Sequence, residues 1–363
     1  MDFILNGQAS GSVASRLLQN GMNTNTLRPY SLPTGRTDRW GQQEYGGTFI
    51  TVNKGGKLVA QKISNAQATL RKEDWVLLDT AIIRAATSRL RAVAALRSRN
   101  LVYNIPNGMG VTVLQSQSQS DINDADISIN GVRESRNDRP HFDLVNLPLP
   151  IIHKDFNLYL REIEASRRGG SPLDTTTAEL AGTKVAELSE KLTIGTYGSF
   201  QFGGGTIYGL TNYPGRLSAD QLTLPTDTSW TPQLFISELL AMKQQSVDAK
   251  HYGPWIVFNS PAWDPYLDED YSAAKGDNTL RERALKIRDL TDMVTLDFLT
   301  GHQIVLVQLT PDVVRMVLGM DVTTLQWEEK GGLEFHFKVM TIQVPQLRSD
   351  FNGNTGIVHG VAS

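Results

Sequence analysis

The sequence predicts a mixed fold in which long helices and regular strands occupy separate stretches of the chain. Apolar residues recur at steps of three and four from Trp75 to Val93, which is the spacing of one helix face. A buried strand is expected at Trp255–Phe258, and alternating apolar residues predict a half-buried strand at Leu333–Val344. With 363 residues, 40% of them hydrophobic and 20% charged, the chain is long enough for two or three cores.

Composition excludes several classes of protein. The chain has no cysteine, which excludes disulfides, a thiol nucleophile and thiolate metal sites. No apolar run approaches the ~18–20 residues that a membrane helix needs. The first residues, MDFILNGQASGSVASRLL, lack the charged and apolar regions of a signal peptide. We therefore expect a soluble protein that is made inside the cell and does not contact a membrane.

Charge is divided unevenly along the chain, although the net charge is only −3. Residues 1–100 contain 14 Lys+Arg and 6 Asp+Glu, a net of +8, whereas the remainder contains 21 and 32, a net of −11. Such regions can attract each other within one chain or between copies, and chance clustering of solvated side chains gives the same totals. The net charge leaves no cationic excess for neutralising phosphates, so specific DNA binding is not expected.

The N-terminal part predicts a polar arm, a hairpin and a helix. Residues 5–48 have no apolar period and would not order by themselves, which suits an arm held by a neighbouring copy or by its own domain. Phe49–Val52 and Leu58–Ala60 flank a glycine-containing turn and predict a hairpin. One helix is expected over residues 73–99. Its later turns carry five arginines, which indicate an anion-facing surface or a solvated face: Arg84, Arg89, Arg91, Arg97 and Arg99.

A second hairpin is expected in the next stretch. Val111–Leu114 and Ile127–Val132 have strand patterns, and the polar sequence QSQSQSDINDAD lies between them. Such a polar insertion is typical of a hairpin that projects from a body rather than packing inside it. Phe142–Ile152 is strongly apolar, as a strand of the body would be.

A long helix follows. Thr176 and Glu179 form a capping box that would open it, and Glu187 and Lys191 would form an i,i+4 ion pair. The helix is expected to end at Gly195 and Gly198, and its apolar face would be Ala181, Val185, Leu188 and Leu192.

In the C-terminal half, the expected helices and strands alternate along the chain. A helix is expected from Pro232 to Gln245, and a second capping box, Thr279 with Glu282, opens a short helix. Further strands are expected at Ile304–Val307, Val313–Leu318 and Thr323–Trp327.

Each candidate chemical motif favours a structural interpretation. Gly203–Gly205 lacks the Lys-Ser/Thr of a phosphate loop and is expected to be a tight turn. Asp121 begins a stretch like a calcium loop, but Ala125 and Asp126 stand where a ligand and the turn glycine belong. The six histidines have no metal-ligand spacing, and there is no Gly-x-Ser-x-Gly elbow. We therefore expect no catalytic residue, no cofactor and no metal.

Five segments, in order, resemble the shell proteins of tailed bacteriophages, and most closely encapsulins. The first is LRKEDWVLLDTAIIRAATSRLRAVAALRSRNLVYNIPNGMGV, a helix with an early Trp that leads through a basic stretch to an Asn-Gly turn. Next come NDRPHFDLVNLPLPIIHKDF, a long helix, and the turn YGLTNYPG. The last segment runs from YGPWIVFNSPAWDPYL to EEKGGLEFHFKVMTIQVP. The resemblance covers about 270 of the 363 residues.

The resemblance implies an α+β fold, the Hong Kong phage-type capsid fold shared by tailed-phage major capsid proteins and encapsulins. Its parts would be an N-terminal arm, a first helix with its connection, a hairpin called the E-loop, a peripheral domain with a long spine helix, an axial domain and a C-terminal tail. These parts would be residues 1–72, 73–107, 108–140, 141–222 with 328–347, 223–327 and 348–363.

The function implied is self-assembly in hexamers and pentamers into the icosahedral head of a phage, enclosing double-stranded DNA. Such a head is built in the bacterial cytoplasm and becomes part of the virion. Its partners would be other copies of the chain, a portal protein, decoration or scaffolding proteins, and packaged DNA bound without sequence specificity. An encapsulin compartment that stores a cargo enzyme is the alternative, and a soluble enzyme is a remote third. About 70 residues precede the Trp75 helix, where encapsulins have almost none, which favours the phage capsid.

Contacts between subunits are expected to be non-covalent. Some related capsids join an E-loop lysine to an asparagine of a neighbour, but this chain has no lysine between Lys72 and Lys154. Polar and charged side chains are expected to contribute instead, each solvated pair by only ~0–1 kcal/mol. The candidates are Arg16, Arg28, Arg36, Arg39, Asp121, Asp124, Asp126, Arg133, Glu134, Arg136, Arg139, Asp268, Glu269 and Asp270.

Overall fold

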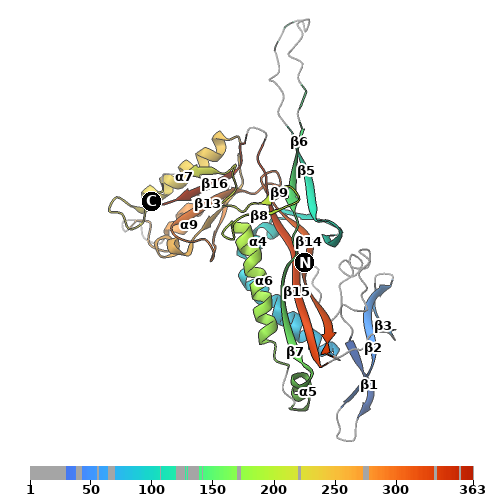
Figure 1. Cartoon of the computed structure of the whole chain (residues 1–363). Helices are drawn as coiled ribbons and strands as arrows, with labels where there is room; N and C mark the ends of the chain where they lie inside the picture. Colours follow the sequence, from blue (N-terminus) through green and yellow to red (C-terminus); the bar gives the residue numbers. More distant parts are fainter. Residues whose placement is uncertain are drawn as a thin grey trace.

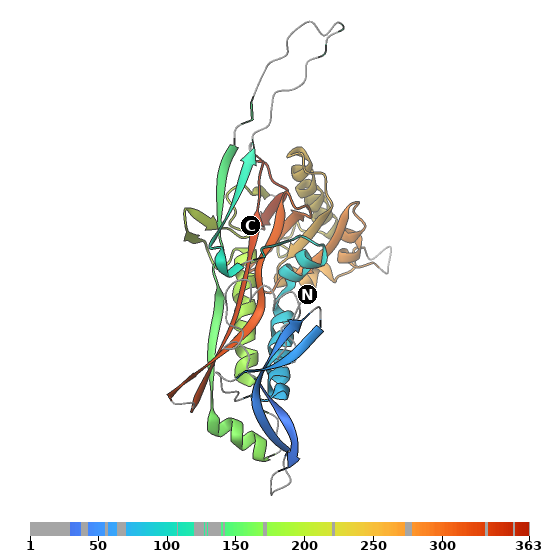
Figure 2. The same ribbon diagram turned by 90° about the vertical axis from the view of Figure 1, so that its right-hand side faces the viewer.

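The chain forms an elongated molecule with a central body, an α/β unit beside it and two projecting β elements (Figures 1 and 2). The computed structural model describes residues 30–37, 43–54, 57–63, 70–106, 108–119, 127, 129, 139–140, 142–169, 173–219, 222–272, 278–330, 333–350 and 353–362.

The body is a four-stranded sheet covered by two long helices. The sheet has the order β4-β14-β15-β7, with bounds Val102–Asn104, Val314–Glu329, Glu334–Leu347 and Ile152–Tyr159. The helices are α3 (Lys72–Arg89) and α6 (Thr176–Ile194), and α5 (Leu160–Gly169) extends from the end of β7. Trp75 meets the ring of Phe337 edge-on at 6.0 Å, and Phe156 stacks on the same ring at 5.0 Å. The alternating stretch predicted at Leu333–Val344 is therefore a strand, β15, and it buries its aromatic residues in this core.

The single helix expected over residues 73–99 is wrong, because the chain breaks at Leu90. There φ is −89° and ψ is 75°, and a second helix, α4 (Arg91–Ser98), begins directly afterwards. The apolar stripe itself is confirmed, since Trp75, Leu78, Ile82, Ala86, Leu90 and Val93 are all buried. The N–H groups at the start of α4, which have no acceptor within the helix, are satisfied by a carboxylate of α6, Glu190, which lies about 100 positions later in the sequence.

The long helix α6 has the predicted apolar face and the predicted end. Ala181, Val185 and Leu192 are buried, and Gly195 ends the helix with φ of +102°. The capping box is wrong, because Thr176 is already helical and Thr175 is the N-cap, whose hydroxyl donates to Glu179 Oε1 at 3.2 Å. The Glu187–Lys191 pair is also wrong. Glu187 accepts from Lys184 at 2.8 Å, whereas Lys191 lies 4.9 Å from the ring of Phe298, a tertiary contact that competes with the helical pair.

The α/β unit contains a five-stranded sheet with the order β10-β16-β13-β11-β12. Its strands are Leu217–Ala219, Ile357–Val361, Gln303–Gln308, Trp255–Asn259 and Leu290–Thr295. Its helices are α7 (Pro232–Asp248), α8 (Asp264–Leu267) and α9 (Leu280–Leu285), with a 3₁₀ turn η2 at Pro261–Trp263. Thr279 is the N-cap of α9, and its hydroxyl accepts from the Glu282 N–H at 3.3 Å, which is one of the two hydrogen bonds of the predicted capping box.

The C-terminal residues are part of this sheet rather than a tail. β16 pairs antiparallel with β13 over five residues and parallel with β10, so it lies inside the sheet. Ile357 and Val358 are completely buried. Residues 348–363, expected to be a tail, therefore supply an interior strand to the α/β unit, and β10 joins it from the preceding stretch.

The hairpin β5–β6 projects from one end of the molecule (Figure 1). β5 (Val113–Gln119) and β6 (Phe142–Pro148) pair antiparallel in regular register from Val113↔Pro148 to Gln119↔Phe142. The apolar residues at 142–145 are not a body strand as predicted, because Phe142 is 53% exposed and Leu144 66% exposed. At the base of the hairpin the 3₁₀ turn η1 (Gly108–Gly110) packs against Gly319. The expected strand Ile127–Val132 lies outside the described residues except Ile127 and Ile129, which are fully exposed.

A three-stranded sheet stands at the opposite end of the molecule, and we call it the wing (Figure 2). Its strands, in the order β1-β2-β3, are Tyr30–Thr37, Gln43–Lys54 and Lys57–Ile63. The hairpin expected around Asn53–Gly56 is confirmed as the β2–β3 pair. Tyr30 is buried in the body core, and the Ser31 N–H donates to Leu70 O at 3.1 Å. The start of β1 is thus the root of the wing, and β1 is exposed from Pro33 onward.

The remaining strands form a small hairpin beside the base of β6. β8 (Phe200–Phe202) and β9 (Gly205–Ile207) pair antiparallel around Gly203 and Gly204, both of which have positive φ. The tight turn expected for this glycine run is therefore confirmed.

Candidate assembly surfaces

Most of the predicted contact residues lie outside the described part of the chain. This holds for Arg16, Arg28, Arg39, Asp121, Asp124, Asp126, Arg133, Glu134 and Arg136. Arg36 is exposed on β1 in the wing, and Arg139 is exposed just before β6. The structure therefore places one predicted residue on each of the two projecting elements.

The acidic run Asp268–Asp270 directly follows α8 and is held by contacts within the chain. Arg281 Nε lies 3.2 Å from Asp268 Oδ1, and Arg281 Nη2 lies 2.8 Å from Asp264 Oδ1. Asp270 forms an isolated antiparallel bridge with Thr279. This loop is consequently well fixed, and the side chain of Asp268 remains 67% exposed toward solvent.

The arginines of α3 and α4 do not form a free cationic face. Arg97 is the most buried of those described, and it bonds Asp321 at 3.1 Å and Gln343 at 2.6 Å. Arg84 and Arg91 each lie 3.3 Å from a carboxylate, and Arg99 lies 3.9 Å from one: Glu179, Asp297 and Asp292, respectively. The solvated face expected from the sequence agrees with Arg84, whose side chain is 76% exposed, and with Arg91, which is 48% exposed. Arg97 instead joins α4 to β14.

The joint between α3 and α4 contains a buried carboxylate. Glu190 is 1% exposed, and its two oxygens accept from the N–H groups of Ala92 at 2.5 Å and Val93 at 3.3 Å. Burial raises the pKa of Glu190 to about 7, the backbone donors oppose this, and the charge of Asp297 adds to it. No sequence pattern indicates this site, because the carboxylate and the helix it caps are far apart along the chain.

The described histidines make structural contacts. His251 Nδ1 lies 2.6 Å from Gln308 Oε1, and His302 meets the ring of Trp263 edge-on at 5.6 Å. Burial, followed by the charge of Arg216, lowers the pKa of His359 to about 4. Within the described ranges no three His, Cys, Asp or Glu side chains are grouped as metal ligands, and no helix there is long and apolar enough to cross a membrane.

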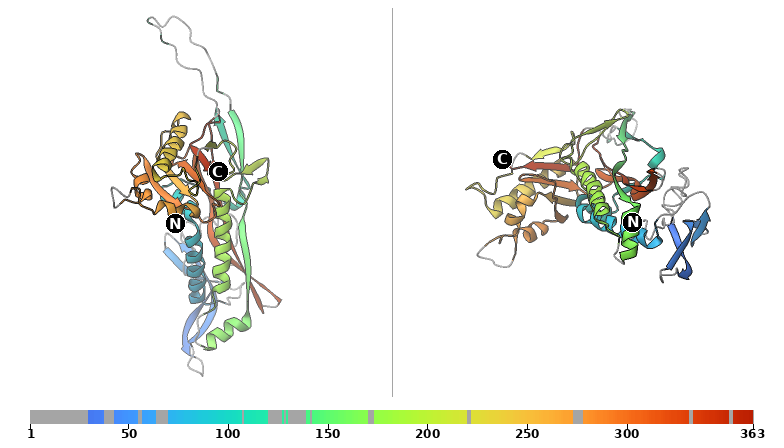
Figure 3. Two further views of the ribbon diagram at one scale, coloured as in Figure 1. Left: turned by 90° about the vertical axis from the view of Figure 1, so that its left-hand side faces the viewer. Right: turned by 60° about the horizontal axis from the view of Figure 1, so that its bottom comes forward.

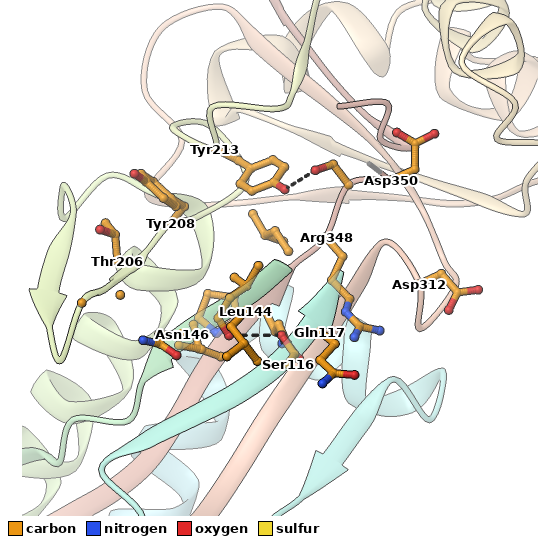
Figure 4. Close-up of a pocket in the computed structure, with 18 of the residues that line it drawn as sticks. Ser116, Gln117, Leu144, Asn146, Thr206, Tyr208, Tyr213, Asp312, Arg348 and Asp350 are labelled. Atoms are coloured by element: carbon orange, nitrogen blue, oxygen red, sulfur yellow. Dashed lines mark hydrogen bonds between the residues drawn. The ribbon is translucent and has the colours of Figure 1, made fainter. Parts of the chain in front are cut away.

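A pocket of about 550 Å³ lies where the base of the β5–β6 hairpin meets the end of β15 and the α/β unit (Figure 4). Arg348 and Asp312 lie at one end of it, and Thr206 and Tyr208 at the other. Tyr213 donates to Ser349 Oγ at 3.0 Å across its upper wall. The lining is mixed polar and apolar, so the pocket suits a peptide segment as well as it suits a small molecule.

Among the described residues, three exposed apolar side chains lie close together on β6 of the hairpin, whereas α3 and α6 each expose one large apolar side chain, Leu77 and Leu180. Phe142, Leu144 and Val145 of β6 are each at least half exposed. A two-stranded hairpin is marginal in water unless another layer covers it. This surface is therefore the strongest candidate for contact with another molecule.

The architecture described above is that of solved viral and virus-like shells. The chain is similar to the virus-like particle from Pyrococcus furiosus, with a TM-score of 0.54 and 16% identity over 78% of this chain and 97% of that one. The capsid of Myoviridae phage XM1 gives a TM-score of 0.55 and 8% identity, covering 70% of this chain and 86% of that one. The α+β capsid and encapsulin fold expected from the sequence is thus confirmed.

The chain belongs to the family described as "Family of unknown function (DUF6260)", which matches residues 65–360. A further relative is the type 1 encapsulin shell protein EncA of Myxococcus xanthus (strain DK1622), 27% identical over 203 residues. That match covers 55% of this chain and 64% of the relative, which is less than two thirds of its length. The family match begins after the wing, whose last strand ends at Ile63.

Proposed function

We propose that this chain is the major capsid protein of a tailed bacteriophage, and that its copies assemble non-covalently into an icosahedral head around double-stranded DNA. The observation that carries the proposal is the capsid fold with two β elements that project from opposite ends of one subunit (Figure 2). Exposed elements of this kind suit a protein that makes several weak contacts with its own copies. Their sum closes a shell although each contact contributes little.

The proposal assigns a role to each part of the fold. The body, with α6 as its spine, corresponds to the peripheral domain, and the α/β unit to the axial domain, to which β10 and β16 now belong. The E-loop is residues 108–140 extended by β6. The wing lies in the N-terminal arm of residues 1–72. Portal, decoration and scaffolding proteins would bind the assembled lattice, and DNA would be enclosed without sequence recognition.

An encapsulin-type compartment that stores a cargo enzyme is the second candidate. The match with an encapsulin shell protein favours it. The wing favours the phage capsid, because encapsulins have almost no chain before the helix that begins here at Lys72. A soluble enzyme is the remote third, and it would need a set of titratable groups arranged around a substrate.

The experiment is to express the full-length chain in bacteria, purify it and image it by electron microscopy. Closed shells of uniform diameter are the expected result, and a monomer or small soluble oligomer would contradict both shell proposals. Particles purified from the natural source then separate the two. Genome-length double-stranded DNA identifies a phage head, whereas a co-purifying enzyme without such DNA identifies a compartment. Genes for terminase, portal and tail proteins nearby would agree with the first outcome.

A further inference from the structure

The wing has an open strand edge at β3. On the other side of the sheet, β1 is attached to the body through Ser31 and Leu70, and Pro33 cannot donate a hydrogen bond to a further strand. The β1–β2 pairing is also irregular at two places. β3, by contrast, pairs with β2 in unbroken register over all seven of its residues, and no strand in the described part of the chain pairs with its outer edge. An edge of this kind is a template for another strand.

The projecting hairpin has a matching edge at β5. The edge of β6 is covered near its base, where Asn146 Nδ2 donates to Gly203 O at 3.2 Å and Gly205 packs on the Asn146 carbonyl. β5 pairs only with β6 among the described residues. Its sequence, VLQSQSQ, contains neither proline nor glycine, and Gln115 and Gln117 are exposed. β5 therefore has the regular backbone that a further strand needs.

The two elements carry opposite charges. The wing sequence, residues 30–63, has five Lys+Arg and two Asp+Glu, a net of +3. The hairpin with its connecting loop, residues 113–148, has three and six, a net of −3. Opposite net charges favour the approach of the two elements when they belong to different copies of the chain.

The two elements cannot meet within one molecule. The hairpin and the wing lie at opposite ends of the elongated chain in two perpendicular views, and the left view of Figure 3 agrees (Figures 1, 2 and 3). A partner must supply the complementary element. Two different patches that match each other make a head-to-tail contact between copies, which generates a ring when the rotation closes.

We propose that the β5 edge of the projecting hairpin adds to the β3 edge of the wing of a second copy of this chain, forming a five-stranded intermolecular sheet. The inference rests on the proposed function, since it identifies one contact of the shell. Backbone hydrogen bonds between the edges supply the affinity. The acidic residues of the loop, such as Asp121 and Asp124, carry the charge that complements Lys54, Lys57 and Lys62.

Cysteine cross-linking tests the pairing cleanly, because the natural chain contains no cysteine. One full-length variant carries Gln61→Cys on β3 and Gln117→Cys on β5, both at exposed positions. The matched control carries Gln117→Cys with Thr37→Cys on β1. Particles of each are verified by electron microscopy, treated with an oxidant or a short bismaleimide, and run on a denaturing gel. We expect a ladder of multimers from the β3/β5 pair and a monomer band from the control and from each single-cysteine variant.

The outcomes separate the two proposals. If the wild-type chain forms no shells, the proposed function fails. If shells form and the β3/β5 pair stays monomeric, or the control cross-links equally well, the pairing is wrong and the proposed function stands. Charge reversal gives a second measurement that needs no cysteine. Lys57→Glu with Lys62→Glu is expected to lower the yield of shells about tenfold at low salt, and adding Asp121→Lys with Asp124→Lys should restore it. Failure of that restoration also contradicts the inference.

Discussion

The buried carboxylate Glu190 makes the stability of the subunit depend on pH. In the folded chain the pKa of Glu190 is about 7, raised mainly by burial, whereas an exposed glutamate titrates near 4.5. The folded state therefore binds more protons than the unfolded state between these two values, and the free energy of unfolding falls as pH rises through that window. The loss is essentially complete about one pH unit above the folded-state pKa, because the carboxylate is then ionised in both states.

The perturbation is Glu190→Gln, which keeps the size of the side chain and one carbonyl acceptor for the N–H of Ala92 or Val93. A shift of ~2.5 pH units at ~1.4 kcal/mol per unit corresponds to ~3–4 kcal/mol, most of which is lost between pH 5 and pH 8. We expect wild-type stability to fall by most of that amount relative to the variant over this range. The variant should thus become relatively more stable as the solution becomes more alkaline.

The assay is urea unfolding of the unassembled full-length subunit at pH 5, 6, 7 and 8, followed by tryptophan fluorescence. The difference between the two proteins isolates Glu190, because every other titrating group is common to both. Asp297→Asn is the companion variant. It removes a negative charge that raises the pKa of Glu190, so the pH dependence should move to lower pH. Parallel pH profiles for wild type and Glu190→Gln would refute the reasoning.

Three further predictions concern the core, the α/β sheet and the assembled shell. Gly108→Ala should cost more than ~3 kcal/mol in unfolding free energy, since its new methyl would lie 2.4 Å from the backbone of Gly319. Gly301→Ala, which meets no atom within 4 Å but has φ of +68°, should cost only ~1–2 kcal/mol in the same urea titration. Because burial lowers the pKa of His359 to about 4, the wild-type melting temperature should fall as pH drops from 6.5 toward 4. His359→Gln should show a smaller fall in melting temperature over this range. An equal fall in both proteins would contradict the prediction. Particles boiled in detergent should give one band near 40.1 kDa on a denaturing gel, and a ladder of multimers would contradict non-covalent assembly.

A deletion that the sequence predicts will leave the body folded needs revision. The charge division along the chain predicts that removing residues 1–45 leaves the body folded and weakens only the shell. Tyr30, however, is 1% exposed in the body core, and β1 and the start of β2 belong to the wing. Removal of residues 1–29 is the cleaner test, because it leaves Tyr30 in place.

The sequence by itself determined the elements whose stabilising contacts are local or periodic. The stripe from Trp75 to Val93, the αL end of α6 at Gly195 and the cap of α9 by Thr279 all follow from neighbours within a few residues. The capsid fold was predicted from the resemblance of five segments, in order, to known shell proteins. Spacing over a few residues is a property of the sequence itself, so features that depend only on such spacing can be predicted from the sequence alone.

The tertiary structure alone decided the features that depend on residues far apart in the chain. Glu190 satisfies the N–H groups that the break at Leu90 leaves free at the start of α4, and β16 is an interior strand because β13 and β10 lie on its two sides. The exposure of Phe142 and Leu144 could not be predicted either, since an apolar strand has the same sequence pattern whether its partner belongs to the same subunit or to another. Periodicity shows which face of an element is apolar, but only the assembled fold shows what covers that face.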